Sequence, residues 1–209
     1  MTRTQKRFIF GGLGLALVAF LAYAIFFRVP SPEEVGRDAL AAVEAGDGRQ
    51  LLKLLTEEEI SGLGLNEQNL SCLLRTLYGP YVRAELRKGA VVLEPNPSMG
   101  VVFVRQPYRL PDGGDWHGLG VNVTTGGGRP KVVSAVRALI NQRIGLELSR
   151  LAEEQRADKR EANARLFEQL APELEKCGLR GMPRRDAVSN VYSVEPWNQY
   201  IARLRGPRS

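Results

Sequence analysis

The sequence has 209 residues, with 29 Lys or Arg, 23 Asp or Glu and a formal net charge of +6. This length suits one domain with its own hydrophobic core, plus short appended segments. One His and two Cys cannot supply the ligands of a zinc site, and no phosphate-binding Gly-rich motif is present. We therefore expect neither a metal ion nor a cofactor.

Residues 8–27 are a run of twenty residues without a charge. As a helix rising about 1.5 Å per residue, this run matches the roughly 30 Å hydrocarbon core of a bilayer. The basic residues Arg3, Lys6 and Arg7 precede it and, by the positive-inside rule, hold the N-terminus in the cytoplasm. The sequence thus predicts a single-pass inner-membrane protein with residues 29–209 extracytoplasmic.

The alternative is a signal peptide cleaved after Ala24, because Ala22-Tyr23-Ala24 matches the small-residue cleavage pattern. Three apolar residues follow this site, where a mature secreted chain usually begins with polar residues. We therefore favour an uncleaved signal anchor. Either interpretation places the rest of the chain in an oxidising compartment.

The net charge overstates how basic the chain is. Without the four basic residues that flank the apolar run, 25 basic residues face 23 acidic ones. Residues 176–209 carry seven basic and two acidic residues, and residues 31–175 carry 18 basic and 21 acidic. This distribution argues against nucleic-acid binding, so we expect no nucleic-acid partner.

Three helices are expected after the linker, and each begins with a capping signal. Ser31 and Asp47 start the first two, because Glu or Gln follows each of them three residues later. Thr56 begins a further capping box, and Asn66 can cap the third helix, whose apolar residues keep the 3.6-residue period. Gly79-Pro80 is expected to end this helix.

From residue 82 the apolar period changes to two, which is typical of strands. Five short runs are separated by turn residues and predict an antiparallel meander, because connections this short join neighbouring strands. The runs are 82–87, 90–94, 100–109, 115–125 and 131–137. Helices followed by such a sheet define an α+β domain whose helices cover one sheet face.

The opening of this domain, ALAAVEAGDGRQLLKLLTEEEI, has a helix, a Gly-Asp break and a Leu-rich second helix. Together with the strands that follow, residues 31–140 resemble the nuclear-transport-factor-2-like superfamily of cystatin-like cones. The members of that superfamily include polyketide-cyclase and dehydratase-like enzymes, ligand-binding modules, and single-span proteins of bacterial secretion and transport assemblies. The last group has the layout of an anchor followed by a domain.

Residues 138–176 return to the helical period, with apolar stripes at both ends and a polar stretch between Glu153 and Arg165. Pro172 is expected to break this helix. Either the extension folds back on the domain through its apolar ends, or it is an arm that binds a partner protein. We favour folding back.

In the basic tail, Trp197, Tyr200, Ile201 and Leu204 recur at helical spacing and predict a short amphipathic helix. This face could contact a partner or lie in a membrane interface. Such faces more often pack on their own domain, and we favour that interpretation.

The two cysteines are Cys72 and Cys177, and a disulfide between them would close a loop of about 105 residues. Nothing in the sequence sets their distance, so a disulfide and two separate thiols are equally compatible with it. A disulfide would tie the long helical extension to the domain.

His117 is the only histidine, and strand alternation places it on one sheet face with Val121. If that face lines a cavity, His117 could act as a general base beside Asp115. A lone histidine near a strand end more often has a structural role, so we assign no catalytic residue. The candidates for lining a pocket are Tyr78, Phe103, Tyr108, His117 and Val121.

The predicted fold class is α+β, with an N-terminal transmembrane helix, three helices packed on a curled antiparallel sheet, and a long C-terminal helix. Six segments follow from these patterns. They are a cytoplasmic basic flank (1–7), the transmembrane helix (8–27), a linker (28–31), the cone-type domain (32–137), the helical extension (138–176) and the basic tail (177–209).

These features predict a membrane-anchored extracytoplasmic interaction module, a component of a bacterial envelope assembly, without enzymatic activity. One alternative is a pocket that binds a small apolar molecule, or a weak cyclase-like or dehydratase-like enzyme that uses His117. Another is a structural spacer. The sheet's inner face decides among them. It could be an open pocket, a filled core or a surface covered by the long helix. The oligomeric state does not follow from the sequence.

Overall fold

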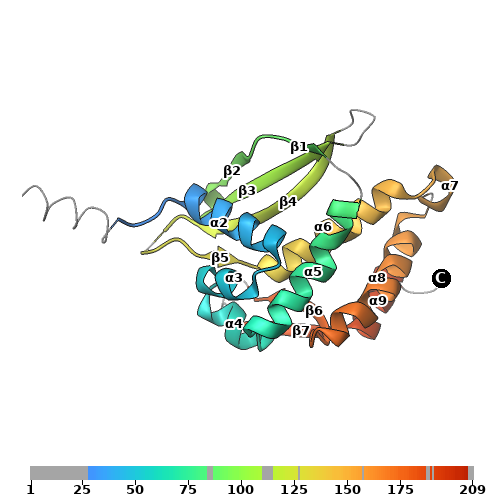
Figure 1. Cartoon of the computed structure of the whole chain (residues 1–209). Coiled ribbons are helices and arrows are strands. Elements are labelled where there is room, and N and C mark those ends of the chain that lie inside the picture. Colours follow the sequence, from blue (N-terminus) through green and yellow to red (C-terminus); the bar gives the residue numbers. More distant parts are fainter. Residues whose placement is uncertain are drawn as a thin grey trace, which may run out of the picture. The chain divides into compact units, whose positions relative to one another are not determined.

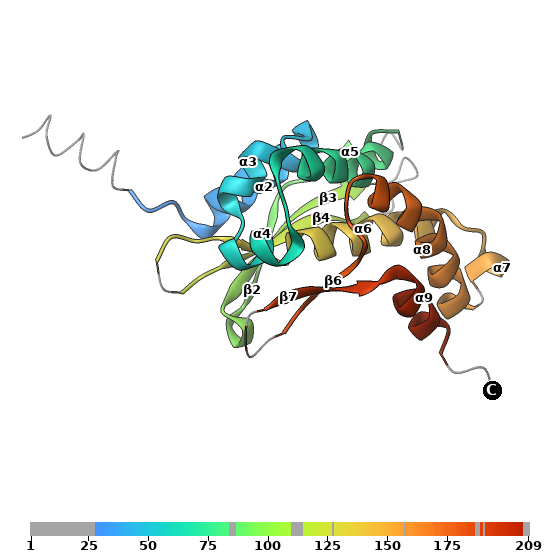
Figure 2. The ribbon, with the colours of Figure 1, turned by 90° about the horizontal axis from the view of Figure 1, so that it is seen from below.

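A curled antiparallel sheet with helices on one face is the centre of the fold (Figures 1 and 2). The structure, a computed structural model, describes residues 28–83, 87–109, 115–126, 128–156, 158–186, 189 and 191–206. Residues 31–209 form a unit of their own, and every helix and strand of the described chain belongs to it.

Four helices precede the sheet, and further helices and a hairpin follow it. The first helices are α2 (Pro32–Ala45), α3 (Gly48–Leu54), α4 (Glu57–Leu63) and α5 (Glu67–Arg83). The sheet contains β1 (Arg87–Lys88), β2 (Val92–Asn96), β3 (Val101–Arg109), β4 (Asp115–Thr124) and β5 (Val132–Val133), with the 3-10 helix η1 (Pro97–Met99) after β2. The C-terminal elements are α6 (Ala135–Arg150), α7 (Glu153–Arg156), α8 (Lys159–Lys176), β6 (Gly181–Arg185), β7 (Tyr192–Pro196) and α9 (Trp197–Arg205).

The helices begin at the caps that the sequence predicts. Ser31 Oγ accepts a hydrogen bond from the Glu34 amide at 3.2 Å, and the Glu34 carboxylate accepts one from the Ser31 amide at 2.7 Å. Asp47 and Thr56 accept hydrogen bonds at the starts of α3 and α4. Thr56 therefore starts a helix of its own, which makes four helices before the sheet instead of three. Glu59, three positions after the Thr56 cap, is fully buried, and its carboxylate does not return to the cap.

Two helices continue through prolines that were expected to end them. α5 runs past Pro80 to its last residue, Arg83, and Tyr81 in this final turn is 1% exposed. α8 runs through Pro172, and Leu174 beyond it is fully buried. A proline inside a helix costs about 3 kcal/mol. Burial of the apolar side chains around and beyond each proline offsets this cost, because a fully buried large apolar side chain contributes about 1.5–3 kcal/mol.

β3 is the central strand of the sheet. β4 pairs with it along one edge, from Val101 opposite Thr124 to Arg109 opposite Asp115. β1 and β2 pair with different halves of the other edge, and β5 pairs with β4. All these pairs are antiparallel, as predicted. A strict meander would place β2 between β1 and β3, so that detail of the prediction is wrong.

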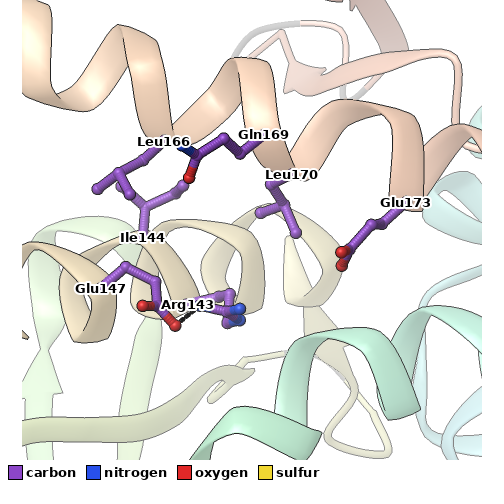
Figure 3. A pocket seen from close by; sticks show the side chains of 7 residues that line it. All are labelled: Arg143, Ile144, Glu147, Leu166, Gln169, Leu170 and Glu173. Carbon is purple, nitrogen blue, oxygen red and sulfur yellow. Dashed lines mark hydrogen bonds and ion pairs between the residues drawn. The ribbon is translucent and has the colours of Figure 1, made fainter.

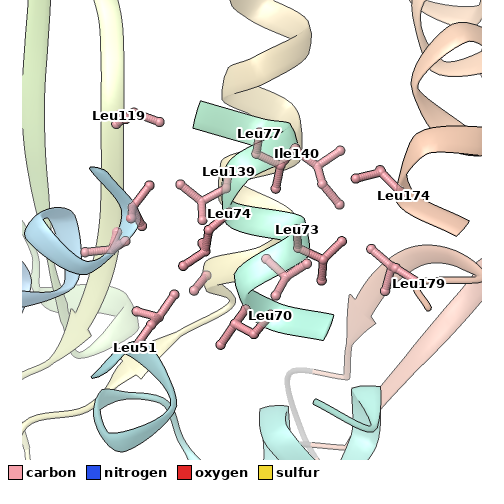
Figure 4. Close-up of a cluster of buried hydrophobic side chains, with 14 of the residues drawn as sticks. Leu51, Leu70, Leu73, Leu74, Leu77, Leu119, Leu139, Ile140, Leu174 and Leu179 are labelled. Carbon is pink, nitrogen blue, oxygen red and sulfur yellow. The ribbon is translucent and has the colours of Figure 1, made fainter. Parts of the chain in front are cut away.

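The helix-facing side of the sheet is filled by a hydrophobic core. Val104 and Tyr108 of β3 and Leu119 and Val121 of β4 are at most 2% exposed. They belong to one cluster with residues of α5 and α6, many of which Figure 4 shows: Leu70, Leu73, Leu74, Leu77, Leu139 and Ile140. The inner face of the sheet is therefore a filled core, which is one of the three arrangements that the sequence left open.

α2 lies close to β3 because Gly36 has no side chain. A Cβ atom at Gly36 would lie 2.4 Å from Val104 Cγ2, and Val104 is fully buried. We expect Gly36→Ala to lower the free energy of unfolding by about 2 kcal/mol, because an overpacked contact costs more than the better helix propensity of Ala returns. Urea denaturation measures the change. Asp38→Ala, on an exposed position of the same helix, is the control, and equal midpoints for the two variants would contradict the close contact.

The helical extension after the sheet consists of α6, α7 and α8, so the single long C-terminal helix was wrong. α6 ends at Arg150, and α8 begins after its N-cap Asp158, whose carboxylate accepts from the amides of the first turn. α8 contacts α5, α6 and α9, and its residues Leu170 and Leu174 are buried in the common core. The extension therefore folds back on the domain. Deletion of residues 146–176 would remove part of this core.

The predicted fold class included an N-terminal transmembrane helix, and this part is corrected. In the portion of the chain that the structure describes, no helix has both the length and the apolar character needed to cross a membrane. The predicted span, residues 8–27, and its basic flank, Arg3, Lys6 and Arg7, lie outside the described residues. We retain neither the signal anchor nor the single-pass inner-membrane location.

Candidate functional site

Four of the residues predicted to line a pocket have described side chains, and they lie on two faces of the sheet and on α5. Tyr108 and Val121 belong to the filled core on the helix-facing side. Phe103 lies on the opposite side, where its ring covers Gly120 so closely that a Cβ atom there would be 2.3 Å from Phe103 Cζ. Tyr78 is partly buried against the core. These four side chains therefore do not converge on a common cavity.

Tyr108 belongs to a hydrogen-bonded network at one end of the sheet. Its hydroxyl lies 3.3 Å from Glu44 Oε1 and 3.3 Å from Tyr78 Oη, and Lys88 Nζ lies 2.5 Å from Glu44 Oε2. Burial, together with the hydrogen bond to Tyr78, raises the pKa of Tyr108, so its hydroxyl remains a donor and is a poor base. The network has a structural role, because it joins α2, α5, β1 and β3.

The candidate general base, His117, lies in β4 with Asp115. Asp115 is paired with Arg109 at the end of β3. The side chains of His117 and Asp115 lie outside the part of the chain that the structure describes. A catalytic role for these two residues stays a prediction.

Cys72 and Cys177 form a disulfide, with their Cα atoms 5.4 Å apart. Cys72 lies in α5, and Cys177 follows the last residue of α8 and is 4% exposed. The bond therefore fastens the C-terminal helices to the central core. It leaves no thiol at these positions for nucleophilic chemistry.

The apolar face of α9 packs inside the protein. Trp197, Tyr200 and Ile201 are at most 7% exposed, and Leu204 is partly buried against the same core. The Phe167 ring of α8 lies 4.8 Å from the Tyr200 ring, centroid to centroid. The Trp197 indole N–H donates to a backbone carbonyl at 3.1 Å. The three buried side chains are thus not available to a membrane or a partner.

A group of arginines surrounds a single buried carboxylate on the hairpin that follows α8. Arg203 of α9 holds both oxygens of Glu195, at 2.9 and 2.8 Å, and Arg184 Nη1 lies 3.9 Å from Glu195 Oε2. Arg137 of α6 lies close enough to influence this carboxylate, and its Nη1 donates to the Pro183 carbonyl at 3.4 Å. We name Arg137, Arg184 and Arg203 the arginine cluster.

The arginine cluster has more positive charge than Glu195 can neutralise. Hydrogen bonds from Arg203 lower the pKa of Glu195, so this carboxyl is ionised at neutral pH. Three guanidinium groups against one carboxylate leave a local excess of two positive charges. The side chains of Arg184 and Arg203 are 60% and 55% exposed, so this excess faces solvent. The cluster can therefore receive an anionic ligand.

The sequence contained only part of the signal for this cluster. The basic tail was recognised as basic, but neither its β6–β7 hairpin nor the position of Glu195 was predicted. Arg137 comes from α6, and only the packing of β6 against α6 brings it to the hairpin that carries Glu195. Charge counting along the chain cannot find such a group, because its members are up to 66 residues apart.

A small pocket lies between α6 and α8 (Figure 3). Its volume is about 170 Å³, and its polar lining comes from Arg143 and Glu147 of α6 and Gln169 and Glu173 of α8. An Nη of Arg143 is paired with Glu147, and the Arg143 side chain is 13% exposed. The sequence did not predict this pocket, because its two walls are separated by the turn around α7.

Comparisons with known proteins do not identify the chain. No family model, no curated protein and no solved structure matches it. The resemblance to the nuclear-transport-factor-2-like superfamily therefore stays a prediction.

Proposed function

We propose that the domain of residues 31–206 is a protein-interaction module that binds an acidic segment of a partner protein through the arginine cluster. The observation that carries this proposal is the excess of guanidinium groups around Glu195 on an exposed surface. The filled inner face of the sheet supports it as well, because it places recognition on the outside of the domain.

The cluster retains hydrogen-bond donors for a ligand. A guanidinium group has five N–H donors. Arg203 uses its Nε and one Nη for Glu195. Among the described residues, Arg137 gives one Nη to a carbonyl, and the Arg184 side chain makes a single ion pair, at 3.9 Å. A carboxylate can bind two parallel N–H groups of a guanidinium, as Glu195 does with Arg203. Partner carboxylates would bind Arg137 and Arg184 in the same way.

A labelled acidic peptide tests the proposal. We expect a fluorescein-labelled peptide of six Glu-Ser repeats to raise its anisotropy on binding, and a Lys-Ser peptide of equal length to remain free. Arg137→Gln/Arg184→Gln should weaken binding about tenfold, because it removes two charge-assisted contacts. Arg203 is kept, since its loss would leave Glu195 buried without its main partner. Higher salt should weaken the interaction.

The matched control removes two arginines of equal charge elsewhere. Arg37 and Arg165 each pair with a glutamate one helical turn away on exposed surfaces. Arg37→Gln/Arg165→Gln should bind the acidic peptide like wild type. Equal weakening in both double variants would show attraction by net charge alone and overturn the proposal. Tighter binding of a twelve-nucleotide single-stranded DNA than of the peptide would also overturn it.

A further inference from the structure

Arg143 places an unused donor in the pocket between α6 and α8. One Nη of this side chain is held by Glu147, and its buried Nε has no hydrogen-bond partner among the described residues. The Nε atom is inaccessible, so a ligand in the pocket would bind the Nη side of this guanidinium group. A carboxylate is well suited, because a charge-assisted hydrogen bond from a guanidinium N–H to a carboxylate oxygen is stronger than one between neutral groups.

The pocket as a whole favours a ligand that also has a positive group. Glu147 is shared by Arg143 and, at 3.4 Å, by Arg150 outside the lining, whereas Glu173 makes no ion pair among the described residues. Figure 3 shows the Glu173 carboxylate extending from α8 toward the side of the pocket where Arg143 lies. A simple carboxylate would be repelled by Glu173, whereas an ammonium group on the same ligand can pair with it.

The remaining wall is apolar and the space is small. Ile144, Leu166 and Leu170 line the pocket beside the charged groups. A volume of about 170 Å³ is well below the roughly 300–1,000 Å³ of sites for drug-sized ligands. The ligand is therefore small, partly aliphatic and zwitterionic.

We propose that this pocket binds a free α-amino acid with a short aliphatic side chain. Its carboxylate binds Arg143, its ammonium group binds Glu173, and its side chain packs on Ile144, Leu166 and Leu170. This site is independent of the proposed protein-interaction function, because none of its residues belongs to the arginine cluster.

Titration with L-valine, followed by two-dimensional ¹H–¹⁵N NMR of the full chain, tests the proposal. We expect saturable shifts in α6 and α8 with a Kd on the order of 1 mM, as befits a ligand of this size. Isobutylamine lacks the carboxylate of valine, and isovalerate lacks its ammonium group. Each should bind at least tenfold more weakly than valine. If isobutylamine binds as tightly as valine, the pocket recognises an amine alone and the proposal is wrong.

Two variants of α8 separate the pocket from the rest of its helix. Glu173→Gln should weaken valine binding at least tenfold, because the ammonium group loses its partner. Glu175→Gln changes an exposed glutamate outside the pocket lining on the same helix and should bind valine like wild type. The NMR spectrum of each variant reports whether it is folded. Equal affinities of the two variants for valine would overturn the proposal. The absence of any shift at about 20 mM valine would overturn it too, because this concentration is well above the expected Kd.

The double variant Arg137→Gln/Arg184→Gln distinguishes the two proposals. It should bind valine normally even though it binds the acidic peptide weakly. Loss of valine binding in this variant would show that the pocket does not act alone, which contradicts the assignment of the ligand to Arg143 and Glu173.

Discussion

Removal of the Cys72–Cys177 disulfide is expected to lower the free energy of unfolding by about 4 kcal/mol. The bond spans a sequence separation of 105 residues, and opening so long a loop restores much conformational freedom to the unfolded chain. It is also the covalent link between α5 and the end of α8. Urea denaturation of Cys72→Ala/Cys177→Ala and of the oxidised wild type measures the loss.

Reduction of the wild type is the matched control for this substitution. It keeps both sulfur atoms in place, so it separates the effect of the open loop from that of lost side-chain contacts. Most of the loss should already appear on reduction, and the reductant should not affect the double variant. Amide exchange should increase first in α8, β6 and α9, which follow or adjoin the bond. A loss below about 1 kcal/mol, less than disulfides typically contribute, would contradict the prediction.

The free energy of unfolding of Glu59→Gln, taken relative to wild type, is expected to increase by about 2–3 kcal/mol between pH 5 and pH 8. The Glu59 side chain is fully buried, and its Oε1 accepts from the Val136 amide in the first turn of α6 at 3.1 Å. The residue before this helix, Ser134, makes no side-chain cap of its own. Glu59 therefore caps α6 from α4, and Gln can accept the same hydrogen bond without ionising.

The direction of this pH effect follows from the proton balance. Burial raises the pKa of Glu59 from 4.5 to about 7, although the Val136 amide opposes the shift. The folded protein then binds more protons than the unfolded chain, so its stability falls as the pH rises. The contribution is complete below pH 4.5 and is lost as the pH rises through 7. Hydrogen bonds from Arg203 and Arg205 lower the pKa values of Glu195 and Glu161. The contribution of these two carboxylates to stability is therefore lost only as the pH falls below 4.5.

Unfolding in urea at pH 5, 6, 7 and 8 measures the effect of Glu59. The wild type should lose stability across this range, while Glu59→Gln should lose much less. Glu58→Gln is the matched control, because it removes an exposed carboxylate from the same turn of α4. Parallel curves for wild type and Glu59→Gln would show that Glu59 ionises normally in the folded protein.

Local structure followed from local sequence signals. The caps at Ser31, Asp47 and Thr56 were predicted because their hydrogen bonds join residues three positions apart. The long antiparallel strands β3 and β4 were predicted from the change of the apolar period to two. The first predicted strand, 82–87, was wrong at its start, which lies in α5, and the last, 131–137, was wrong at its end, which lies in α6. Predictions failed where distant contacts outweighed a local rule. α5 and α8 continue through Pro80 and Pro172, and Glu59 left its capping box to bind the first turn of α6.

The candidate sites were much less accessible from the sequence. His117 and the aromatic residues were chosen on the assumption of an open inner face, and side-chain volumes fill that face instead. The arginine cluster joins α6, β6 and α9, and the pocket joins α6 and α8. Each depends on how helices pack after the chain has turned back on itself.

The sequence by itself therefore determined the α+β class, the starts of the helices before the sheet, the long strands β3 and β4 and the short C-terminal helix, because these depend on periodicity and on hydrogen bonds between near neighbours. Only the tertiary structure decided that Cys72 and Cys177 are joined, that the inner face is filled, and that Arg137 contacts the hairpin that carries Glu195. These features arise when buried apolar surface brings distant segments together, and no short-range pattern specifies which segments meet.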